Sequence, residues 1–161
     1  GADERLGTAL ATYVHQVGER SGMRVEVAID DIALDIPANI AHELLRIAQE
    51  ATANARRHSS ARNLWVVYRA SPDGVLLRIA DDGRGLRPET GRRAGDGVGL
   101  TIMHERAERL GGSLTVRPRV GGGTVVECLV VPSAAKRPIG VSTTAQGLEA
   151  SPAPSIAAVV A

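Results

Sequence analysis

Apolar and polar residues repeat along the chain with two different periods, which separate the predicted helices from the predicted strands. Apolar residues three and four positions apart predict helices over residues 4–20, about 39–58 and about 99–110. Ser21-Gly22 and Gly111-Gly112 are predicted to end the first and the last of them, because glycine readily adopts the left-handed conformation that closes a helix. We therefore expect three amphipathic helices, each with one face to bury.

Alternation of apolar with polar residues, and short apolar runs between turn signals, predict the strands. These cover residues 23–29, 63–68, 75–80, 113–117 and 124–131. The turn Ser71-Pro72-Asp73-Gly74 and the glycines 121–123 are expected to join the last four strands into two antiparallel hairpins. Hairpins with helices gathered on one face predict an α/β (α+β) two-layer sandwich with a mixed, mostly antiparallel sheet, not an alternating parallel fold.

Composition narrows the class of protein. With 161 residues, of which 43% are hydrophobic, the chain has the size and apolar content of one domain. The sequence shows no apolar run long enough to span a membrane and no charged start followed by an apolar stretch, so we expect a cytoplasmic location. A formal charge of +1, with no Phe, one Trp and two Tyr, disfavours a nucleic-acid partner.

Two further features of the sequence carry no expected chemistry. Cys128 is the one cysteine and sits in an apolar run, so we expect a buried and inert thiol. From Pro132 onward the chain is rich in Ala, Ser, Pro and Thr without a period, which predicts a disordered tail over residues 133–161.

The first group of residues that suggests chemistry lies on the second predicted helix. Glu50 and Asn54 are four residues apart and therefore one above the other, and Arg57 continues the same stripe at the margin of the apolar face. These side chains suit a polyphosphate bound with Mg²⁺, because Mg²⁺ prefers oxygen ligands and a cation neutralises phosphate. The alternative is a solvated helix face with a weak ionic pairing, and the helix taken alone favours it.

The second group is Asp81-Asp82-Gly83-Arg84-Gly85, which directly follows a predicted strand. Two glycines separated by one residue let the backbone approach a ligand closely. A carboxylate at the end of a strand can accept a hydrogen bond from an exocyclic amine such as that of adenine. A common Asp-Gly turn is the alternative, whereas a calcium loop fails because no further Asp or Asn follows at the required positions.

The third group is Gly95-Asp96-Gly97-Val98-Gly99-Leu100, immediately before the last predicted helix. Glycines that open a helix favour a phosphate, because free N–H groups point outward there and the helix dipole attracts an anion. A dinucleotide fingerprint would follow a strand inside a parallel unit, and the common phosphate-binding loop would end in Lys-Ser/Thr; neither condition is met. A nucleotide site here must have another design.

Together the three groups resemble one known family. A helix with Glu-x-x-x-Asn, a strand ending in Asp-x-Gly-x-Gly, and a loop ending in Gly-x-Gly-Leu before a helix are similar to the Bergerat-type ATPase fold of gyrase, the Hsp90 chaperones, MutL and histidine kinases. The longer sequence segments around these motifs resemble those of the sensor histidine kinases that include the nitrate sensors. These segments are residues 45–51, 54–58, 81–85, 99–107 and 121–124. The resemblance covers about residues 22–131.

This resemblance implies roles for the residues on the second helix. In the family, the carboxylate at the position of Glu50 acts as general base or orients the phosphoryl acceptor, and the amide at the position of Asn54 holds Mg²⁺. Arg57 and His58 match positions that approach the phosphates. The implied cofactors, ATP and Mg²⁺, agree with the needs of phosphoryl transfer, which are positioning, a metal and charge neutralisation.

The resemblance also implies how the nucleotide is recognised. The carboxylate at the position of Asp81 reads the adenine amine, and Thr124 supports it through a hydrogen-bond network. The residues expected to shape the pocket and its lid are Gly83, Gly85, Gly97, Gly99 and Leu100. Three arginines in the segment 86–96 suit a basic lid over the triphosphate, or alternatively keep a mobile loop soluble.

The acceptor of the phosphoryl group is not expected in this chain. Sensor kinases phosphorylate a histidine in an acidic-His-Asp segment of a separate dimerisation helix, and the sequence has no such segment. His15 lacks that context, so we expect it to be exposed on the first helix, and the other histidines are too scattered for zinc. Residues 1–21 resemble the end of a dimerisation helix with its linker, followed by an ATP-binding domain over residues 22–132.

These expectations combine into one function. The chain is expected to bind Mg-ATP and to donate the γ-phosphate to a histidine on the dimerisation domain of its own receptor, from which a response regulator takes it. The full-length protein is expected to be a homodimer. Two alternatives stay open, an anti-sigma-factor-type serine kinase of the same fold and a nucleotide-binding interaction module without turnover. The first helix and the sequences of residues 45–51 and 121–124 disfavour the serine kinase.

Overall fold

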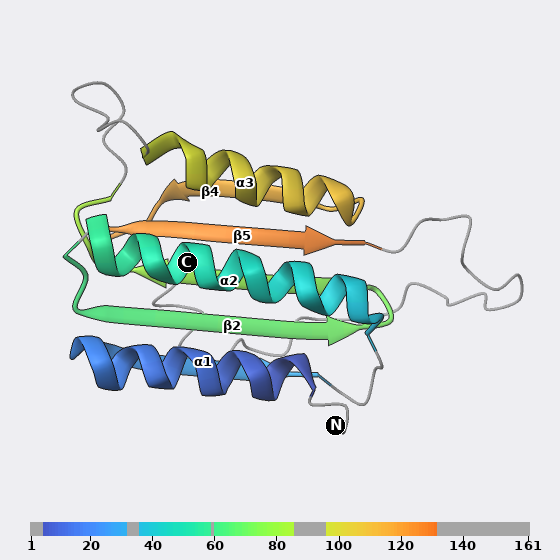
Figure 1. Ribbon diagram of the computed structural model, residues 1–161, viewed down its shortest axis with the longest axis horizontal. Coiled ribbons are helices and arrows are strands. Elements are labelled where there is room, and N and C mark those ends of the chain that lie inside the picture. The colour runs from blue at the N-terminus through green and yellow to red at the C-terminus, as the bar shows by residue number, and fades with distance from the viewer. Residues whose placement is uncertain (1–4, 32–35, 59, 86–95, 132–161) are drawn as a thin grey trace, which may run out of the picture.

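The computed structural model describes residues 5–31, 36–58, 60–85 and 96–131. Over these residues, three helices and five strands follow one another. Figure 1 shows how they are arranged in space. They are α1 (Leu6–Ser21), β1 (Arg24–Asp30), α2 (Ala38–His58), β2 (Asn63–Ser71), β3 (Gly74–Asp81), α3 (Asp96–Arg109), β4 (Ser113–Pro118) and β5 (Thr124–Val130). The predicted tail, and Arg87, Arg92 and Arg93 of the predicted lid, lie outside the described residues.

The strands form one five-stranded sheet in the order β1-β2-β3-β5-β4. β1 runs parallel to β2, whereas the pairs β2–β3, β3–β5 and β4–β5 are antiparallel. A parallel pair needs a long crossover, and α2 supplies it between β1 and β2. The β2–β3 hairpin closes between Ser71 and Gly74, where the sequence predicts its turn. The predicted mixed, mostly antiparallel sheet is confirmed.

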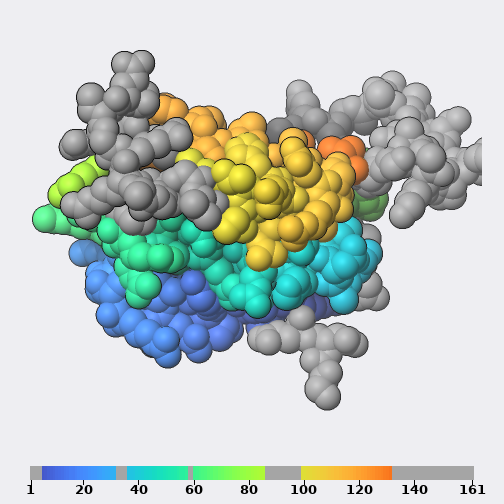
Figure 2. Space-filling model, turned by 45° about the horizontal axis from the view of Figure 1, so that its top comes forward, coloured from blue at the N-terminus to red at the C-terminus, as the bar shows by residue number. Residues whose placement is uncertain are grey.

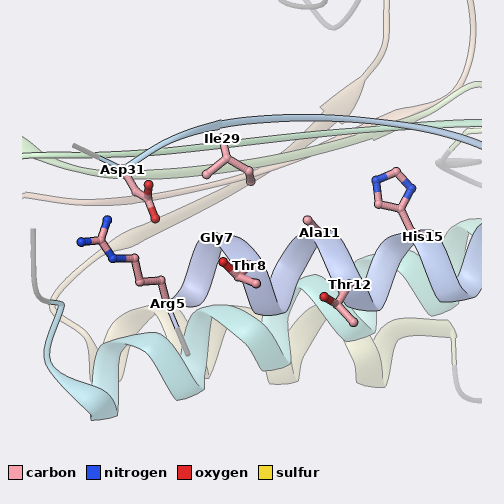
Figure 3. Close-up of a pocket in the computed structure, with 8 residues that line it drawn as sticks. All are labelled: Arg5, Gly7, Thr8, Ala11, Thr12, His15, Ile29 and Asp31. Carbon is pink, nitrogen blue, oxygen red and sulfur yellow. The ribbon is translucent and has the colours of Figure 1, made fainter. Parts of the chain in front are cut away.

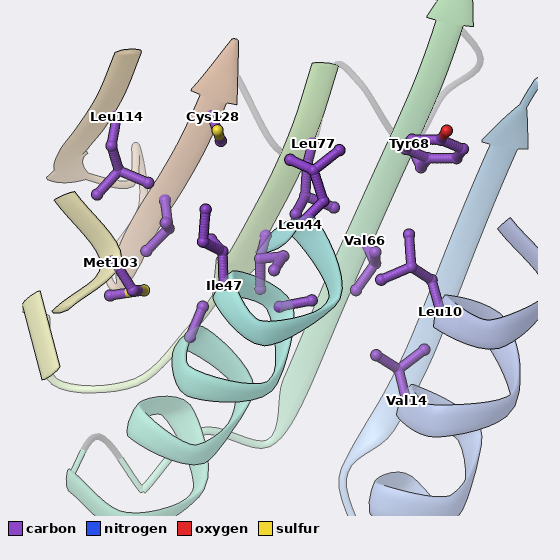
Figure 4. Close-up of a cluster of buried hydrophobic side chains, with 14 of the residues drawn as sticks. Leu10, Val14, Leu44, Ile47, Val66, Tyr68, Leu77, Met103, Leu114 and Cys128 are labelled. Carbon is purple, nitrogen blue, oxygen red and sulfur yellow. The ribbon is translucent and has the colours of Figure 1, made fainter. Parts of the chain in front are cut away.

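All three helices lie over one face of the sheet (Figure 1), and α2 contacts both α1 and α3. The main core fills the space between helices and sheet, and Figure 4 shows side chains from both layers meeting there. Leu10, Leu44 and Val66 are completely buried in it. Burial of an aliphatic side chain of this size stabilises a fold by about 1.5–3 kcal/mol. The predicted two-layer sandwich is therefore confirmed.

Helix α1 is part of this core. Leu6, Leu10 and Val14 are buried in the same cluster as the apolar face of α2, whereas His15 lies on the exposed side, as expected. Gly22 ends the helix in the left-handed conformation, with φ 76°, and its N–H donates to the Gly18 carbonyl at 2.9 Å. The division placed after residue 21 does not coincide with an edge of the core, because the apolar stripe of α1 is buried on this sheet. That α1 continues a dimerisation helix stays a prediction.

The other face of the sheet carries a second, smaller apolar cluster. It consists of Trp65, Ala80 and Val125. The Arg119 guanidinium lies 4.4 Å from the centroid of the Trp65 ring, a cation–π contact that also covers this cluster. On the same face, Arg78 and Glu127 form an ion pair across β3 and β5, with 2.7 Å between nitrogen and oxygen.

Cys128 is completely buried on the helix-facing side of β5, as the sequence predicts. Burial raises the pKa of its thiol to about 11, so very little of it is thiolate at neutral pH. The expectation of an inert thiol agrees with this environment.

The last helix begins earlier than the sequence predicts. α3 begins at Asp96, so Gly97 and Gly99 belong to its first turns instead of to a loop that precedes it. Glycine is a poor helix former, which is why the pattern places the start near residue 99. Packing against α2 overrides this local preference, because Met103 and Ala107 of α3 are buried in the main core.

Candidate functional site

The predicted site residues come together at one end of the domain. The end of α2, the beginning of α3, the end of β3 and the beginning of β5 meet there, on the helix-covered side of the sheet (Figure 1). Figure 2 shows α2 at the surface between α1 and α3. Four segments far apart in the sequence thus contribute to one region, as the proposed pocket requires.

Glu50 faces the beginning of α3. A Cβ atom built on Gly99 would collide with the Glu50 carboxylate and would lie only 3.1 Å from its Cδ carbon. A side chain at residue 99 would have to displace the Glu50 carboxylate from this position, so glycine lets the carboxylate lie directly against α3. Leu100, the next residue, packs against the main core and fixes this end of α3.

Asn54 and Arg57 continue the Glu50 stripe along α2. Asn54 is partly buried one turn beyond Glu50, and Arg57 is exposed. His58 is the last residue of α2, and its side chain lies outside the description. A carboxylate and an amide oxygen on one stripe, beside a glycine that leaves room, fit Mg²⁺, which takes few protein oxygens and completes its shell with phosphate and water.

Asp81 is the last residue of β3 and is 8% exposed. Its Oδ1 atom accepts a hydrogen bond from the Gly83 N–H at 2.8 Å, which shapes the turn after the strand. Asp81 pairs with Thr124 of β5 across the sheet. Neighbours in register point to the same face, so these two side chains share the helix-covered side, as the expected adenine site requires.

Asp82 has a structural role at the ends of two neighbouring strands. Its Oδ1 atom accepts hydrogen bonds from the backbone N–H groups of Arg62 and Asn63 at 2.8 and 2.9 Å. Its Oδ2 atom accepts a third from the Asn63 side chain at 2.6 Å. Burial raises the pKa of Asp82, but the hydrogen bonds from Asn63 and Arg62 outweigh burial and hold the pKa below its usual value. The carboxylate thus ties the beginning of β2 to the end of β3.

Glycines bring two loops into contact beside Asp81. Gly85 has φ 74°, and a Cβ on it would lie 3.1 Å from the Gly123 carbonyl oxygen. Gly123 is buried with φ 107°, and a Cβ there would collide with the Asp81 backbone carbonyl. Sequence reasoning places Gly123 in a hairpin turn and misses its place beside the site. The glycine run 121–123 before Thr124 is the signal that could have found it.

An ion pair between α2 and α3 is also missing from the prediction. Glu43 Oε2 lies 2.8 Å from Arg106 Nη1, and Glu43 Oε1 lies 3.7 Å from Arg109 Nη1. The hydrogen bond from Arg106 is the main reason why the pKa of Glu43 is lowered. Glu43 and Arg106 are 63 positions apart, so no local pattern reveals the pair.

A hollow at the opposite end of the domain does not involve the candidate site. Figure 3 shows it on the outer flank of α1, beside the end of β1. Gly7 packs there so closely that a Cβ would lie 2.6 Å from Ile29 Cγ2 and 2.9 Å from an Asp31 oxygen. The predicted site residues do not line this hollow.

Comparison with known proteins shows the family. Residues 39–135 match the model of the histidine kinase-, DNA gyrase B- and HSP90-like ATPases. This match covers more than half of the chain, so the chain belongs to this ATPase family. The resemblance stated from the sequence motifs is confirmed.

Relatives and a solved structure narrow the class within this family. The sensor histidine kinase YxjM of Bacillus subtilis is 36% identical over 121 residues, which are 74% of this chain and 29% of that protein. The nitrate/nitrite sensor protein NarX of Escherichia coli is 38% identical over 97 residues, 60% of this chain and 16% of that protein. The histidine kinase domain of the Erythrobacter litoralis EL346 blue-light activated histidine kinase has a TM-score of 0.61 and 26% identity, over 81% of this chain and 65% of that one.

Within the ATPase family, the chain is thus similar to the sensor histidine kinases. The chain spans less than a third of the length of the two curated relatives. Among the helices that the structure describes, none has the length and apolar character needed to cross a bilayer.

Proposed function

We propose that this domain binds Mg-ATP at the α2, α3 and β3–β5 end and donates the γ-phosphate to a histidine on a separate dimerisation domain. The main support for this proposal is the position of Glu50, Asn54 and Asp81, which lie on the helix-covered side of one end of the sheet. A response regulator then takes the phosphoryl group. Two-component signalling from the cytoplasmic part of a homodimeric sensor is the context that the relatives' class suggests.

Asp81 gives the site its preference for adenine. A buried carboxylate accepts hydrogen bonds, and the adenine ring carries an amine donor at the position where guanine carries a carbonyl acceptor. A guanine carbonyl facing the Asp81 carboxylate would place two acceptors together in a buried site, which is costly. Thr124, Gly83 and Gly85 surround this position from β5 and from the turn after β3.

Glu50, Asn54 and Arg57 act on the phosphates. The Asn54 amide oxygen holds Mg²⁺, which when bound neutralises charge on the triphosphate. Arg57, at the exposed edge, attracts the phosphates, together with the His58 position. Glu50 orients the acceptor histidine or takes up its proton. Gly97 and Gly99 leave the beginning of α3 open to the phosphate groups, whose charge the helix dipole favours.

Calorimetric titration with ATP and GTP, with and without Mg²⁺, tests nucleotide binding. We expect binding that is selective for ATP and strengthened by Mg²⁺, and we expect Asn54→Ala mainly to remove the effect of Mg²⁺. Equal affinity for ATP and GTP contradicts the role of Asp81. An Asn54→Ala variant that keeps the full Mg²⁺ effect contradicts the metal assignment.

Transfer of labelled γ-phosphate to a dimerisation domain supplied in trans tests the reaction. We expect label on histidine, which acid removes, and no label in the Glu50→Ala variant. Acid-stable label on serine would indicate the serine kinase alternative instead. Tight ATP binding with no transfer to any added acceptor would indicate a nucleotide-binding module without turnover.

A further inference from the structure

Helices α2 and α3 run antiparallel and touch at two defined points. Near the site, Gly99 lies against the Glu50 carboxylate. At the other contact, Arg106 pairs with Glu43. Seven residues separate the two contact points on either helix, so the two contacts stand in the same register, about 10 Å apart along the helices.

The buried apolar contacts of α3 hold it against α2 more firmly than they fix its position along α2. Met103 and Ala107 are buried among its described side chains, and Leu100 and Leu110 pack partly buried against the core near its two ends. Methionine is flexible and fills gaps of different shape, and alanine offers only a methyl group. Such a surface resists separation of the two helices but opposes sliding along the helix axis only weakly. A directional contact would therefore add to Leu100 in setting the register.

The ion pair supplies that contact. The Glu43 side chain is only 17% exposed, and both of its oxygens face arginines of α3. The hydrogen bond that Arg106 donates to Glu43 is charge-assisted and short, which makes it stronger and more directional than an ordinary surface pair. Arg106 and Arg109 also lie in the last turn of α3, where the helix dipole favours positive charge.

We propose that Glu43 is a positioning residue for the nucleotide site, which it reaches through Arg106 and the register of α3. A shift of α3 by one residue is about 1.5 Å. Such a shift in either direction would move Gly99 away from the Glu50 carboxylate and Leu100 away from its place against the core. Glu43 thus holds Gly99 beside Glu50 although it does not touch the nucleotide. This inference rests on the proposed function of the site.

The domain contains a matched control for this experiment. The Arg78–Glu127 pair on the opposite face of the sheet has an N–O distance of 2.7 Å and side-chain exposures of 21% and 25%. The Arg106–Glu43 pair has 2.8 Å, 25% and 17%. The two pairs are thus alike in geometry and exposure, but only one connects α2 to α3.

ATP affinity in the presence of Mg²⁺ is measured by titration for Glu43→Gln, Arg106→Gln and their double variant, beside Glu127→Gln. We expect the first two to weaken binding about five- to tenfold, within the range of coupling through a packed element. The double variant is expected to be no weaker than the worse single variant, because both remove the same contact. Glu127→Gln should stay within about twofold of wild type at a comparable loss of thermal stability.

Hydrogen exchange without nucleotide gives a second, independent measurement. Amides of residues 100–103 in α3 are expected to exchange faster in Glu43→Gln than in wild type, and unchanged in Glu127→Gln. Wild-type affinity and wild-type exchange in Glu43→Gln would overturn the positioning role. Equal weakening by Glu127→Gln would also overturn it, since general stability would then explain the effect. If the wild-type chain bound no ATP, the proposed function would be contradicted. The exchange measurement would still decide whether Glu43 positions α3.

Discussion

Asp81 and Asp82 are neighbours at the end of β3, but the structure uses them in different places. Asp81 lies on the helix-covered side beside Thr124, where the pocket is proposed. Asp82 turns to the beginning of β2 and accepts three hydrogen bonds from Arg62 and Asn63. The difference arises because β3 ends at Asp81, so that Asp82 lies just beyond the strand and beside the beginning of β2, where its N–H donates to the Asn63 carbonyl. Asp81 thus lies where the adenine site is proposed, whereas its neighbour holds the two strands together.

The largest effect on ATP affinity is expected at Asp81, the carboxylate proposed to bind adenine. Asp81→Ala should weaken ATP binding by about 100-fold, because loss of a hydrogen bond to a charged group in a buried site costs roughly 1.5–3 kcal/mol. Titration of the variant and of wild type with ATP measures this. Unfolding by urea serves as the control, since a folded variant shows that the pocket and not the fold is lost. Unchanged affinity would mean that the adenine amine is read elsewhere.

The neighbouring carboxylate should show the opposite behaviour. Asp82→Ala is expected to lower the free energy of unfolding by about 2–3 kcal/mol, because it leaves Arg62 and Asn63 donors without their acceptor. ATP affinity, measured at a temperature where the variant is folded, should stay within about twofold. Urea denaturation and titration give the two values. A stable Asp82→Ala variant with poor ATP binding would reverse the assignment of the two residues.

The hydrogen bonds of Asp82 should also make the free energy of unfolding depend on pH in the acid range. The hydrogen bonds from Asn63 and Arg62 outweigh the effect of burial and lower the pKa of Asp82. A carboxyl with a lowered folded-state pKa adds stability that is complete above its unfolded pKa of about 3.9 and disappears as the pH falls through the folded value. Wild type should therefore lose more free energy of unfolding than Asp82→Asn when urea denaturation is repeated between about pH 5 and pH 2.

Glu43 contributes to this acid response with the same sign, because the hydrogen bond from Arg106 lowers its pKa. The acid titration is therefore compared in a Glu43→Gln background, where only the contribution of Asp82 differs. In that background, the free energy of unfolding is plotted against pH with Asp82 present and with Asp82→Asn. Parallel curves would show that Asp82 does not stabilise the fold through its charge.

The smallest effect is expected at a buried polar group that, unlike Asp82, has no partner in the described part of the chain. Thr52 of α2 is completely buried, and its hydroxyl makes no hydrogen bond there. Thr52→Val keeps the shape and removes the unsatisfied hydroxyl, so it should raise the free energy of unfolding by about 0.5–1 kcal/mol. Loss of more than about 1 kcal/mol in urea denaturation would mean that the hydroxyl does have an acceptor.

The fold could be predicted from the sequence where the signal is local. Apolar spacing gives the three helices, and turn residues give both hairpins, because periodicity and turn chemistry act over a few residues. The beginning of α3 is missed because its packing on α2 outweighs the poor helix propensity of Gly97 and Gly99. The stripe of α1 predicts a buried face, but not that this face is covered by the same core as α2, because an amphipathic pattern does not identify its partner.

The candidate site divides in the same way. Glu50, Asn54 and Asp81 are predicted from spacing and from the family resemblance, since each sits in a short motif, and their roles stay predictions. The contacts Glu43–Arg106 and Gly99–Glu50 join segments about 50 to 60 residues apart and depend on the register of two helices, which no motif contains. The role of Asp82 depends on where β2 begins, so the sequence alone does not separate it from Asp81.

The buried thiol of Cys128 has a practical consequence for following this domain. It is the one cysteine of the chain, and burial together with a pKa raised to about 11 makes it unreactive toward thiol reagents at neutral pH. A cysteine introduced at an exposed residue of α3, such as His104, therefore becomes the one position that a fluorescent or spin label can reach. The wild-type chain is in this respect already a label-free background for measuring how α3 moves when nucleotide binds.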